Sequence, residues 1–180
     1  MRLAGPGTVR DPDWVLAALR QHETALLRYS ASLVGESRAQ DVVQDAFLKL
    51  CAQPPESVQD HVAAWLFTVC RNRALELRRA ERRFSAFEED DAMQSPDSGP
   101  GAKLERAENM SRVDAAMAAL NGRQREVLRL KVEGGLSYKE IAEVLSLSVG
   151  NVGFILHTAI ASLREQLQEQ ESTASQGRAL

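Results

Sequence analysis

An arginine-rich segment at residues 71–83 offers the clearest chemistry in the chain, which is ionic contact with phosphate. It holds six arginines against Glu76 and Glu81, a net charge of +4. At helical spacing these residues form two adjacent rows, one of Arg71, Arg78 and Arg82 and the other of Asn72, Arg79 and Arg83. Such rows can follow a phosphate backbone, and the amide of Asn72 can contact a base edge. The alternative is an ordinary solvated face of a surface helix.

The residues that precede this segment could hold an unpaired base. Loop 53–60 and His61 could cover an extruded base, because a flipped base needs a pocket and a polar group that contacts its edge. The chemistry of this region would then be capture of a nucleotide beside the phosphate-binding rows, without any covalent step.

A second candidate site is the segment Asp41–Lys49, which could dock on a partner protein. It places acidic and amide side chains beside apolar ones, namely Asp41, Gln44, Asp45, Phe47 and Leu48. This combination suits a basic partner helix. The alternative is a plain amphipathic core helix, which is the stronger interpretation of this segment taken alone.

Residues 136–163 predict two short helices around a tight turn. Ser137 and Glu140 have the capping-box spacing, and Ser148 can cap the second helix. This arrangement is typical of a helix-turn-helix, whose second helix enters the major groove of DNA. The alternative is an ordinary helical hairpin.

The predicted recognition helix, residues 149–162, contains no Lys or Arg. Its outward residues are predicted to be Asn151, Gly153, Phe154, His157 and Thr158. Asn151 could pair with adenine, and Gly153 would let the backbone approach DNA closely. Positive charge must come from neighbouring residues, namely Arg123, Arg125, Arg129, Lys131 or Lys139. Because residues 106–170 hold eight basic and eight acidic side chains, we expect weak DNA binding by this part alone.

No motif in the chain predicts an enzyme. It has no Gly-rich phosphate loop with Lys, no HExxH and no GxSxG. Its histidines, His22, His61 and His157, are scattered, and a lone His is more often a surface or packed residue than a catalyst. Cys51 and Cys70 lack a CxxC pattern, so we expect buried thiols in a reducing cytosol. We therefore expect no catalytic residue, no metal and no cofactor.

Helices must position all of these residues. Apolar periodicity predicts a helix over 14–33, a second that opens at Ser37 with Gln40 at the capping-box position, and a third over about 60–84. The predicted buried stripe of the second helix is Val42, Val43, Ala46, Phe47 and Leu50. The predicted stripe of the third is Ala63, Leu66, Phe67, Cys70, Ala74 and Leu77. Three helices that share apolar faces suffice for a small bundle.

The composition changes after this bundle. Residues 85–105 carry six acidic side chains against Lys103, a net charge of −5, whereas the whole chain carries −3. Their Pro, Gly and Ser content predicts a flexible linker. Further helices are predicted over 104–120 and 123–132, before the helix-turn-helix.

The chain is thus predicted to be all-α, with two small helical domains. The predicted boundaries are 11–84 for the first domain, 85–105 for the acidic linker, 106–170 for the helix-turn-helix domain and 171–180 for a disordered tail. No apolar run approaches the roughly 18 residues that a membrane span needs, and the N-terminus has no apolar signal region. We therefore expect a cytoplasmic protein without membrane contact.

Three motifs in this order give the chain a family resemblance over residues 14–168. They are AQDVVQDAFLKL, AAWLFTVCRNRALELRRAERR and LNGRQREVLRLKVEGGLSYKEIAEVLSLSVGNV. The chain resembles a bacterial RNA polymerase sigma factor of the extracytoplasmic function (ECF) group. The resemblance implies a non-catalytic protein that binds core RNA polymerase, directs it to specific promoters and aids promoter melting.

The resemblance also implies roles for individual residues. The residues implied in binding core polymerase are Asp41, Gln44, Asp45, Phe47 and Leu48. Those implied in contacting the melted minus-ten element are His61, Trp65, Arg71, Asn72, Arg73, Arg78 and Arg79. Those implied in contacting the upstream minus-thirty-five element are Lys139, Ser148, Asn151, Val152, Gly153 and His157. The acidic linker is similar to those that pass through polymerase towards the RNA exit path.

Two departures from the family pattern bear on these roles. Asn121-Gly122 stands where the family commonly has Leu-Pro, and a capping Asn can start the helix equally well. The family usually has basic residues near Gly153, Ile155 or Thr158, where this chain is neutral. The resemblance therefore implies that the first domain and polymerase carry a larger share of promoter binding.

Two other functions remain as alternatives. A stand-alone regulator would bind duplex DNA through the helix-turn-helix without polymerase, although the basic segment and the uncharged recognition helix argue against it. An interaction module would use its second domain mainly to dock on polymerase or an inhibitor. Members of the ECF group are often held by an anti-sigma factor, so such a partner is a further hypothesis.

Overall fold

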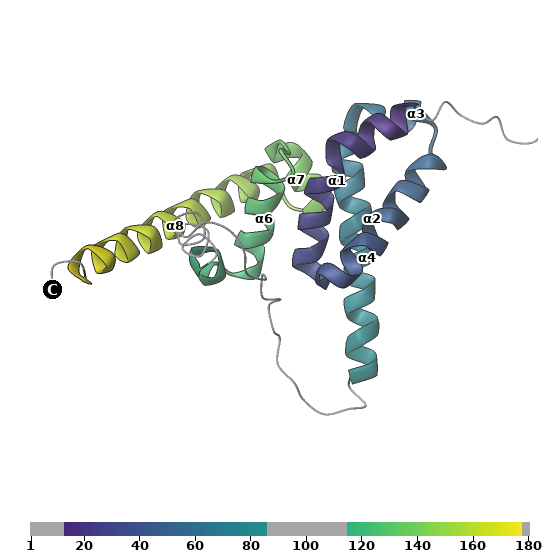
Figure 1. The fold of residues 1–180 in the computed structure, drawn as a ribbon. Helices are drawn as coiled ribbons and strands as arrows, with labels where there is room; N and C mark the ends of the chain where they lie inside the picture. The colour runs from purple at the N-terminus through teal and green to yellow at the C-terminus, as the bar shows by residue number, and fades with distance from the viewer. Residues whose placement is uncertain (1–12, 86–114, 178–180) are drawn as a thin grey trace, which may run out of the picture. The chain divides into compact units, whose positions relative to one another are not determined.

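The structure is a computed structural model that describes residues 13–85 and 115–177, with side chains at 13–83 and 115–168. Every regular element in these ranges is a helix (Figure 1), which confirms the all-α prediction. The chain divides into two compact units, residues 1–91 and 92–180. Apart from Ser85, the predicted linker lies outside the described residues.

The first unit is a bundle of three long helices. They are α1 (Asp13–Val34), α2 (Glu36–Cys51) and α4 (Val62–Ser85), and each packs on the other two. The rings of Tyr29 on α1 and Phe67 on α4 meet edge to face, with centroids 5.2 Å apart. Both rings are fully buried, and this contact anchors the bundle because aromatic side chains bury large apolar areas.

The second helix begins differently from the prediction. Its N-cap is Gly35, with φ 81° and ψ 162°, and no side chain caps it. The predicted capping box of Ser37 and Gln40 is therefore wrong. The positive φ, which only glycine adopts at little cost, turns the chain sharply between α1 and α2. The helix consequently starts at Glu36, so Ser37 already lies inside it.

The predicted loop 53–60 is largely helical. It contains α3 (Pro55–Val58), and the 3₁₀ turn η1 (Gln59–His61) follows directly and leads into α4. Val58 is buried, so this connection packs against the bundle instead of covering a pocket as an open loop.

The buried stripe of α4 is confirmed in its middle and differs at its ends. Leu66, Phe67, Cys70 and Ala74 are buried, as predicted. At the start, Ala64, which lies three residues before Phe67 on the same face, is buried in place of Ala63, which is half-buried. Leu77 is only half-buried, and α4 runs past the ends of the other helices of the bundle (Figure 1).

The second unit contains the helix-turn-helix. Its helices are a short stretch at 115–119, then α6 (Gly122–Val132), α7 (Tyr138–Leu145) and α8 (Val149–Gly177). The axes of α7 and α8 are bent by 103° at the turn, within the roughly 90–120° typical of this motif. Of the predicted helix 104–120, the described part confirms only the last turns.

The predicted caps of this unit are confirmed. Asn121 forms a capping box with Gln124 at the start of α6, and Ser137 forms one with Glu140 at the start of α7. The hydroxyl of Ser148 accepts a hydrogen bond of 3.2 Å from the N–H of Asn151. Each of these bonds satisfies a backbone donor that the first helical turn leaves unpaired.

The C-terminal helix extends further than predicted. Helix α8 continues to Gly177, so residues 171–177 are helical and not a disordered tail. The residues between 164 and 176 include several strong helix formers, Glu, Gln and Ala, and no proline, so nothing in the sequence ends the helix earlier.

The two cysteines lie in different environments. Cys70 is buried, as predicted, whereas Cys51 is exposed, which corrects the prediction of two buried thiols. Cys51 is the last residue of α2, and the neighbouring Leu50 occupies the buried position there. Burial raises the pKa of the Cys70 thiol to about 12, so this thiol stays protonated and unreactive at neutral pH.

A thiol-alkylating reagent should therefore modify Cys51 alone in the native chain. We expect one adduct by mass spectrometry at neutral pH and two adducts after denaturation. Cys51→Ser should abolish native labelling without changing the helical circular dichroism. Rapid native modification of Cys70 would contradict the buried position of this thiol.

Candidate nucleic-acid and protein interfaces

Four of the five residues predicted to bind polymerase lie on the solvent side of α2. Asp41 and Gln44 are exposed, Asp45 is half-buried and Leu48 is 62% exposed. Phe47 is only 8% exposed and packs in the bundle core. The prediction of Phe47 as a docking residue is therefore wrong, because a partner cannot reach its ring.

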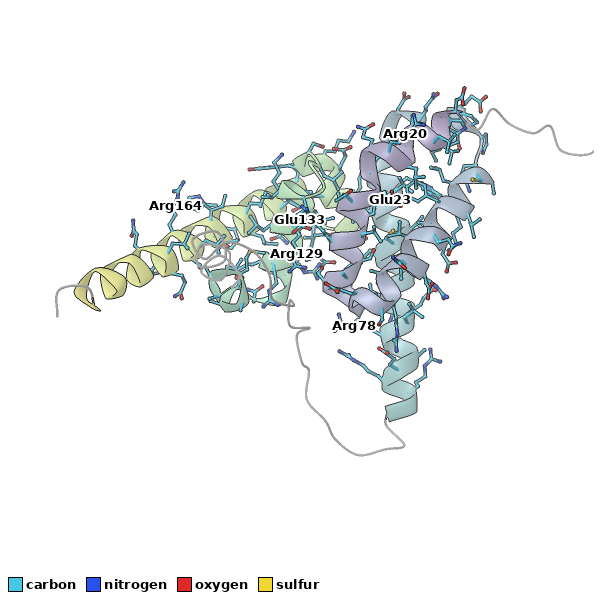
Figure 2. All side chains as sticks on the ribbon, in the orientation of Figure 1. Arg20, Glu23, Arg78, Arg129, Glu133 and Arg164 are labelled. Atoms are coloured by element: carbon cyan, nitrogen blue, oxygen red, sulfur yellow. The ribbon has the colours of Figure 1, made fainter. Side chains whose placement is uncertain are left out.

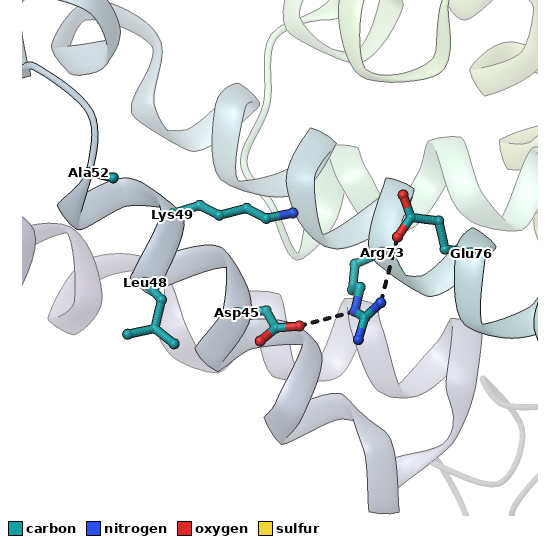
Figure 3. A pocket seen from close by; sticks show the side chains of 6 residues that line it. All are labelled: Asp45, Leu48, Lys49, Ala52, Arg73 and Glu76. Carbon is teal, nitrogen blue, oxygen red and sulfur yellow. Dashed lines mark hydrogen bonds and ion pairs between the residues drawn. The ribbon is translucent and has the colours of Figure 1, made fainter.

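The exposed side of α2 meets α4 at a charged contact. The Nε of Arg73 donates a hydrogen bond of 3.0 Å to Oδ2 of Asp45, and its Nη1 lies 3.6 Å from Oε2 of Glu76. Figure 3 shows the guanidinium of Arg73 between the two carboxylates. These side chains line an open depression of about 430 Å³ together with Leu48, Lys49 and Ala52.

This contact brings together residues that were predicted to serve different partners. Asp45 was assigned to polymerase and Arg73 to DNA, yet Arg73 lies on the α2 side of α4 and pairs with Asp45. Both side chains are partly exposed, so we expect only about 0.2–1 kcal/mol from the pair. Its main effect is to fix the direction of the Asp45 carboxylate.

The outward face of α4 carries the other predicted DNA residues. Asn72 and Arg79 are exposed and Trp65 is half-buried. These three are spaced by seven residues, close to two helical turns, so they share one face. His61 is exposed just before α4 begins.

A neighbouring row of α4 carries Arg71 and Arg78, both half-buried. Arg78 is labelled on α4 in Figure 2. The structure thus brings these side chains onto adjacent faces of one helix, which can present several positive charges to a phosphate backbone.

Some of the residues predicted to contact the upstream element are exposed on or beside the recognition helix α8. Ser148, Asn151 and His157 are exposed, and so is Lys139 on α7. Val152 is 0% exposed. Its prediction as a DNA contact is wrong, because the face of α8 that includes Val152 packs inside the unit.

Gly153 is also placed differently from the prediction. It is half-buried, and a Cβ at this position would lie 3.8 Å from the ring of Tyr138. The glycine therefore lies against an aromatic ring of α7, and the close approach of a DNA backbone that we predicted is not available on that flank.

Two of the five basic residues predicted to supply positive charge to the motif donate hydrogen bonds within the unit. Arg125 donates hydrogen bonds to the carbonyl oxygens of Met117, Ala118 and Leu120. Lys131 donates one of 3.0 Å to the carbonyl of Leu136.

The other three basic residues predicted to supply positive charge to the helix-turn-helix are Arg123, Arg129 and Lys139. Arg123 and Lys139 are exposed, whereas Arg129, which Figure 2 labels on α6, is half-buried. Only these two exposed charges are readily available to phosphates, which is consistent with the weak intrinsic DNA binding that the neutral composition predicts.

Phe154 is a surface residue to which the sequence reasoning assigned no role. It was correctly predicted to face outward, and it is 67% exposed. The sequence feature that could have indicated a role is the position of this phenylalanine on the polar side of a predicted amphipathic helix.

No single helix in the described ranges is long and apolar enough to cross a membrane. The bent pair of α7 and α8, over residues 138–145 and 149–168, passes that test by length and composition only. Its apolar side chains include Ile141, Leu145 and Leu156, which are buried in the unit.

Comparison with known families identifies both units. The family described as Sigma-70 region 2 matches residues 18–84, and Sigma-70 region 4 matches residues 110–163. The ECF RNA polymerase sigma factor SigL of Mycobacterium tuberculosis is 33% identical over 153 residues, which cover 83% of this chain and 86% of SigL. The chain belongs to the ECF RNA polymerase sigma factors. The ECF sigma factor RpoE of Cereibacter sphaeroides is 29% identical, over 77% of this chain and 75% of RpoE.

Solved structures share the fold of this sigma factor. The sigma factor RpoE in complex with the anti-sigma factor NepR, from Bartonella quintana, aligns with a TM-score of 0.68 at 24% identity, over 88% of this chain and 98% of that one. CnrH in complex with the cytosolic domain of CnrY aligns with a TM-score of 0.57 at 24% identity, over 89% and 91%. Sigma factors initiate transcription with core RNA polymerase at promoter DNA, and these are the partners of this chain.

The capping box of α7 predicts an acid-sensitive helix-turn-helix. Hydrogen bonds from Ser137, first from its side chain and then from its backbone, lower the pKa of Glu140 below 4.5. A carboxylate with a lowered folded pKa stabilises the protein above its unfolded pKa, and this stabilisation is lost as pH falls through the folded value.

We therefore expect hydrogen-exchange protection of α7 to fall below about pH 4.5. Ser137→Ala should lower this protection by about 1 kcal/mol near neutral pH and reduce its acid dependence. The measurement is hydrogen exchange by mass spectrometry, corrected for the intrinsic exchange rate. Glu143→Gln, at an exposed carboxylate of α7 outside the capping box, is the control. An unchanged acid dependence in Ser137→Ala would contradict the assigned cause.

Proposed function

We propose that this sigma factor binds core polymerase through the outward face of α2 and captures the melted minus-ten strand on the outward face of α4. One observation carries the proposal. The two faces adjoin at the contact of Asp45, Arg73 and Glu76, so one bundle presents a protein-binding surface beside a nucleic-acid-binding surface. A strand opened on polymerase would then lie next to the residues that hold it.

The polymerase-binding surface consists of Asp41, Gln44, Asp45 and Leu48. Its carboxylates suit a basic partner and Leu48 supplies an exposed apolar contact. Charged groups of opposite sign steer such an encounter, while apolar burial at its centre contributes affinity. Arg73 acts here as a positioning residue, because it orients Asp45.

The strand-binding surface consists of His61, Trp65, Arg71, Asn72, Arg78 and Arg79. The arginines neutralise phosphates, and Trp65 and Asn72 offer a ring and an amide to an unpaired base. The binding free energy offsets the cost of unstacking, which is a few kcal/mol per base step. The mechanism is non-catalytic, so no residue acts as an enzyme would, and the chain acts in the cytoplasm.

In the same proposal the helix-turn-helix contacts the upstream promoter element as duplex. Lys139 and Ser148 would contact phosphates, and Asn151 and His157 would contact base edges. The functional domains are proposed to span 11–84 and 106–170, with the acidic linker 85–105 between them.

We further propose that the chain has an anti-sigma partner. The support is that both similar structures described above are complexes with anti-sigma proteins, NepR and the cytosolic domain of CnrY. The exposed face of α2 is a suitable target, since covering Leu48 and Asp45 would also block polymerase.

Transcription with purified core polymerase tests the principal proposal. With a genomic fragment library as template, the chain should create discrete new start sites. Asp45→Ala should weaken core binding about tenfold, the equivalent of about 1.4 kcal/mol. Asn72→Ala should leave core binding intact and reduce strand opening, measured by permanganate reactivity of unpaired thymines, by a similar factor.

Glu23→Ala is the matched control, because it also removes an exposed carboxylate but lies on α1, outside the proposed surface. Equal losses in Glu23→Ala and Asp45→Ala would contradict the polymerase-binding surface. No stimulation of polymerase, together with tight duplex binding by the chain alone, would favour a stand-alone regulator.

Affinity purification from cells tests the proposed anti-sigma partner. Before induction, the chain should be recovered mainly with a protein other than polymerase, and adding core polymerase should compete with that protein. Leu48→Ala should weaken recovery of both partners. Recovery of polymerase subunits alone under all growth conditions would overturn this proposal.

A further inference from the structure

The exposed face of the recognition helix α8 carries an aromatic side chain, Phe154, at a position where a basic side chain could lie. Phe154 is the most exposed aromatic side chain among the described residues, at 67%. Leaving such a side chain in water forgoes the stabilisation that burial would give. Because the face of a recognition helix that points away from its own core is the one that enters the major groove, an exposed aromatic there is in a position to contact a base.

The position of Phe154 on α8 defines that contact. Phe154 lies four residues after Gly150 and three before His157, and all three are exposed, so they form one outward stripe. Val152 and Leu156 pack on the opposite side in the core. Phe154 is in the second turn of α8, and the first turns of a recognition helix reach the base edges in the major groove.

The chemistry of this stripe excludes the commonest contact to guanine. That contact is a bidentate pair from Arg or Lys to O6 and N7, and residues 149–163 contain neither. An aromatic ring instead makes apolar contact with the C5-methyl of thymine, and an Asn amide pairs with adenine. Asn151 is exposed at the start of the same helix, so both side chains select A·T pairs.

The neighbours of Phe154 favour DNA over a protein as the covering surface. Polar side chains that are exposed around it include Ser148, Asn151 and His157. They interrupt the apolar area, and the amide of Asn151 at such a position can hydrogen-bond to a base edge in the major groove. The exposed Lys139, in the first turn of α7, adds a positive charge that can contact a phosphate.

We propose that Phe154 determines upstream specificity by apolar contact with thymine methyl groups, so that this sigma factor prefers A·T pairs at the bases facing the second turn of α8. The proposal rests on the function proposed above, in which α8 contacts the upstream element as duplex. It assigns specificity to a residue outside the set that the sequence predicted for DNA contact.

Replacing thymine by uracil tests this directly, because uracil lacks only the C5-methyl group and keeps its base pairing. Holoenzyme formed from core polymerase and the full chain is titrated on a promoter found in the transcription experiment. Each upstream thymine is replaced in turn. Loss of one buried methyl should weaken binding about fourfold, from about 0.8 kcal/mol per methyl.

Phe154→Ala should weaken binding to the thymine promoter at least as much, and uracil at the sensitive positions should then have no further effect. Ile160→Ala is the matched control, since Ile160 is also exposed on α8 but lies off this stripe. Uracil in the spacer should change nothing in either protein. Circular dichroism should show that Phe154→Ala stays folded, as expected for an exposed side chain.

Three results would overturn the proposal and each has a different meaning. If uracil has no effect at any upstream thymine while the wild-type protein still depends on the upstream sequence, α8 recognises that sequence without Phe154. If Phe154→Ala weakens all templates equally, including one without an upstream element, Phe154 contacts a protein. If replacing the whole upstream element changes nothing for the wild type, the proposed duplex contact of α8 itself fails.

Discussion

The first unit depends on the burial of one apolar face of α4 between α1 and α2. Phe67 meets Tyr29 edge to face, and Leu66, Cys70 and Ala74 continue the same face. Each fully buried large side chain contributes about 1.5–3 kcal/mol. Because that face must point inward, the arginines of α4 are forced onto its remaining sides. The same constraint that stabilises the bundle therefore creates its positively charged surface.

The charged contact between α2 and α4 divides these arginines into two groups. Arg73 is paired with Asp45 and Glu76, whereas Arg79 lies on the outward face. A second pair, Arg38 with Glu81, also joins α2 to α4. These partly exposed pairs add little stability, but they fix which charges of α4 belong to the α2 surface and which are available to a nucleic acid.

The second unit also buries one face of its helices, although α6 and α7 are shorter than the long helices of the bundle. Its turn has Ser146 in the left-handed region, with φ 54°, and side-chain caps begin the two helices that flank the turn. Burial of Val152 and Leu156 orients α8. Phe154, Asn151 and His157 are exposed as a consequence. Under the proposed function, this neutral surface would leave most of the promoter affinity to polymerase and the first unit, and α8 would contribute selectivity.

The sequence by itself determined the long helices of the chain, the family and the caps of the second unit. Capping depends on residues only three apart, so Asn121, Ser137 and Ser148 could be predicted from local spacing alone. The apolar periodicity likewise predicted Leu66, Phe67 and Cys70 as buried.

Only the tertiary structure decided which side chains beside each predicted apolar stripe are covered by another helix. Ala64 is buried in place of Ala63, and Arg73 is drawn to Asp45, because helices distant in sequence pack beside them. A helical period gives the direction of a side chain around its own axis, but its exposure depends on where the other helices lie.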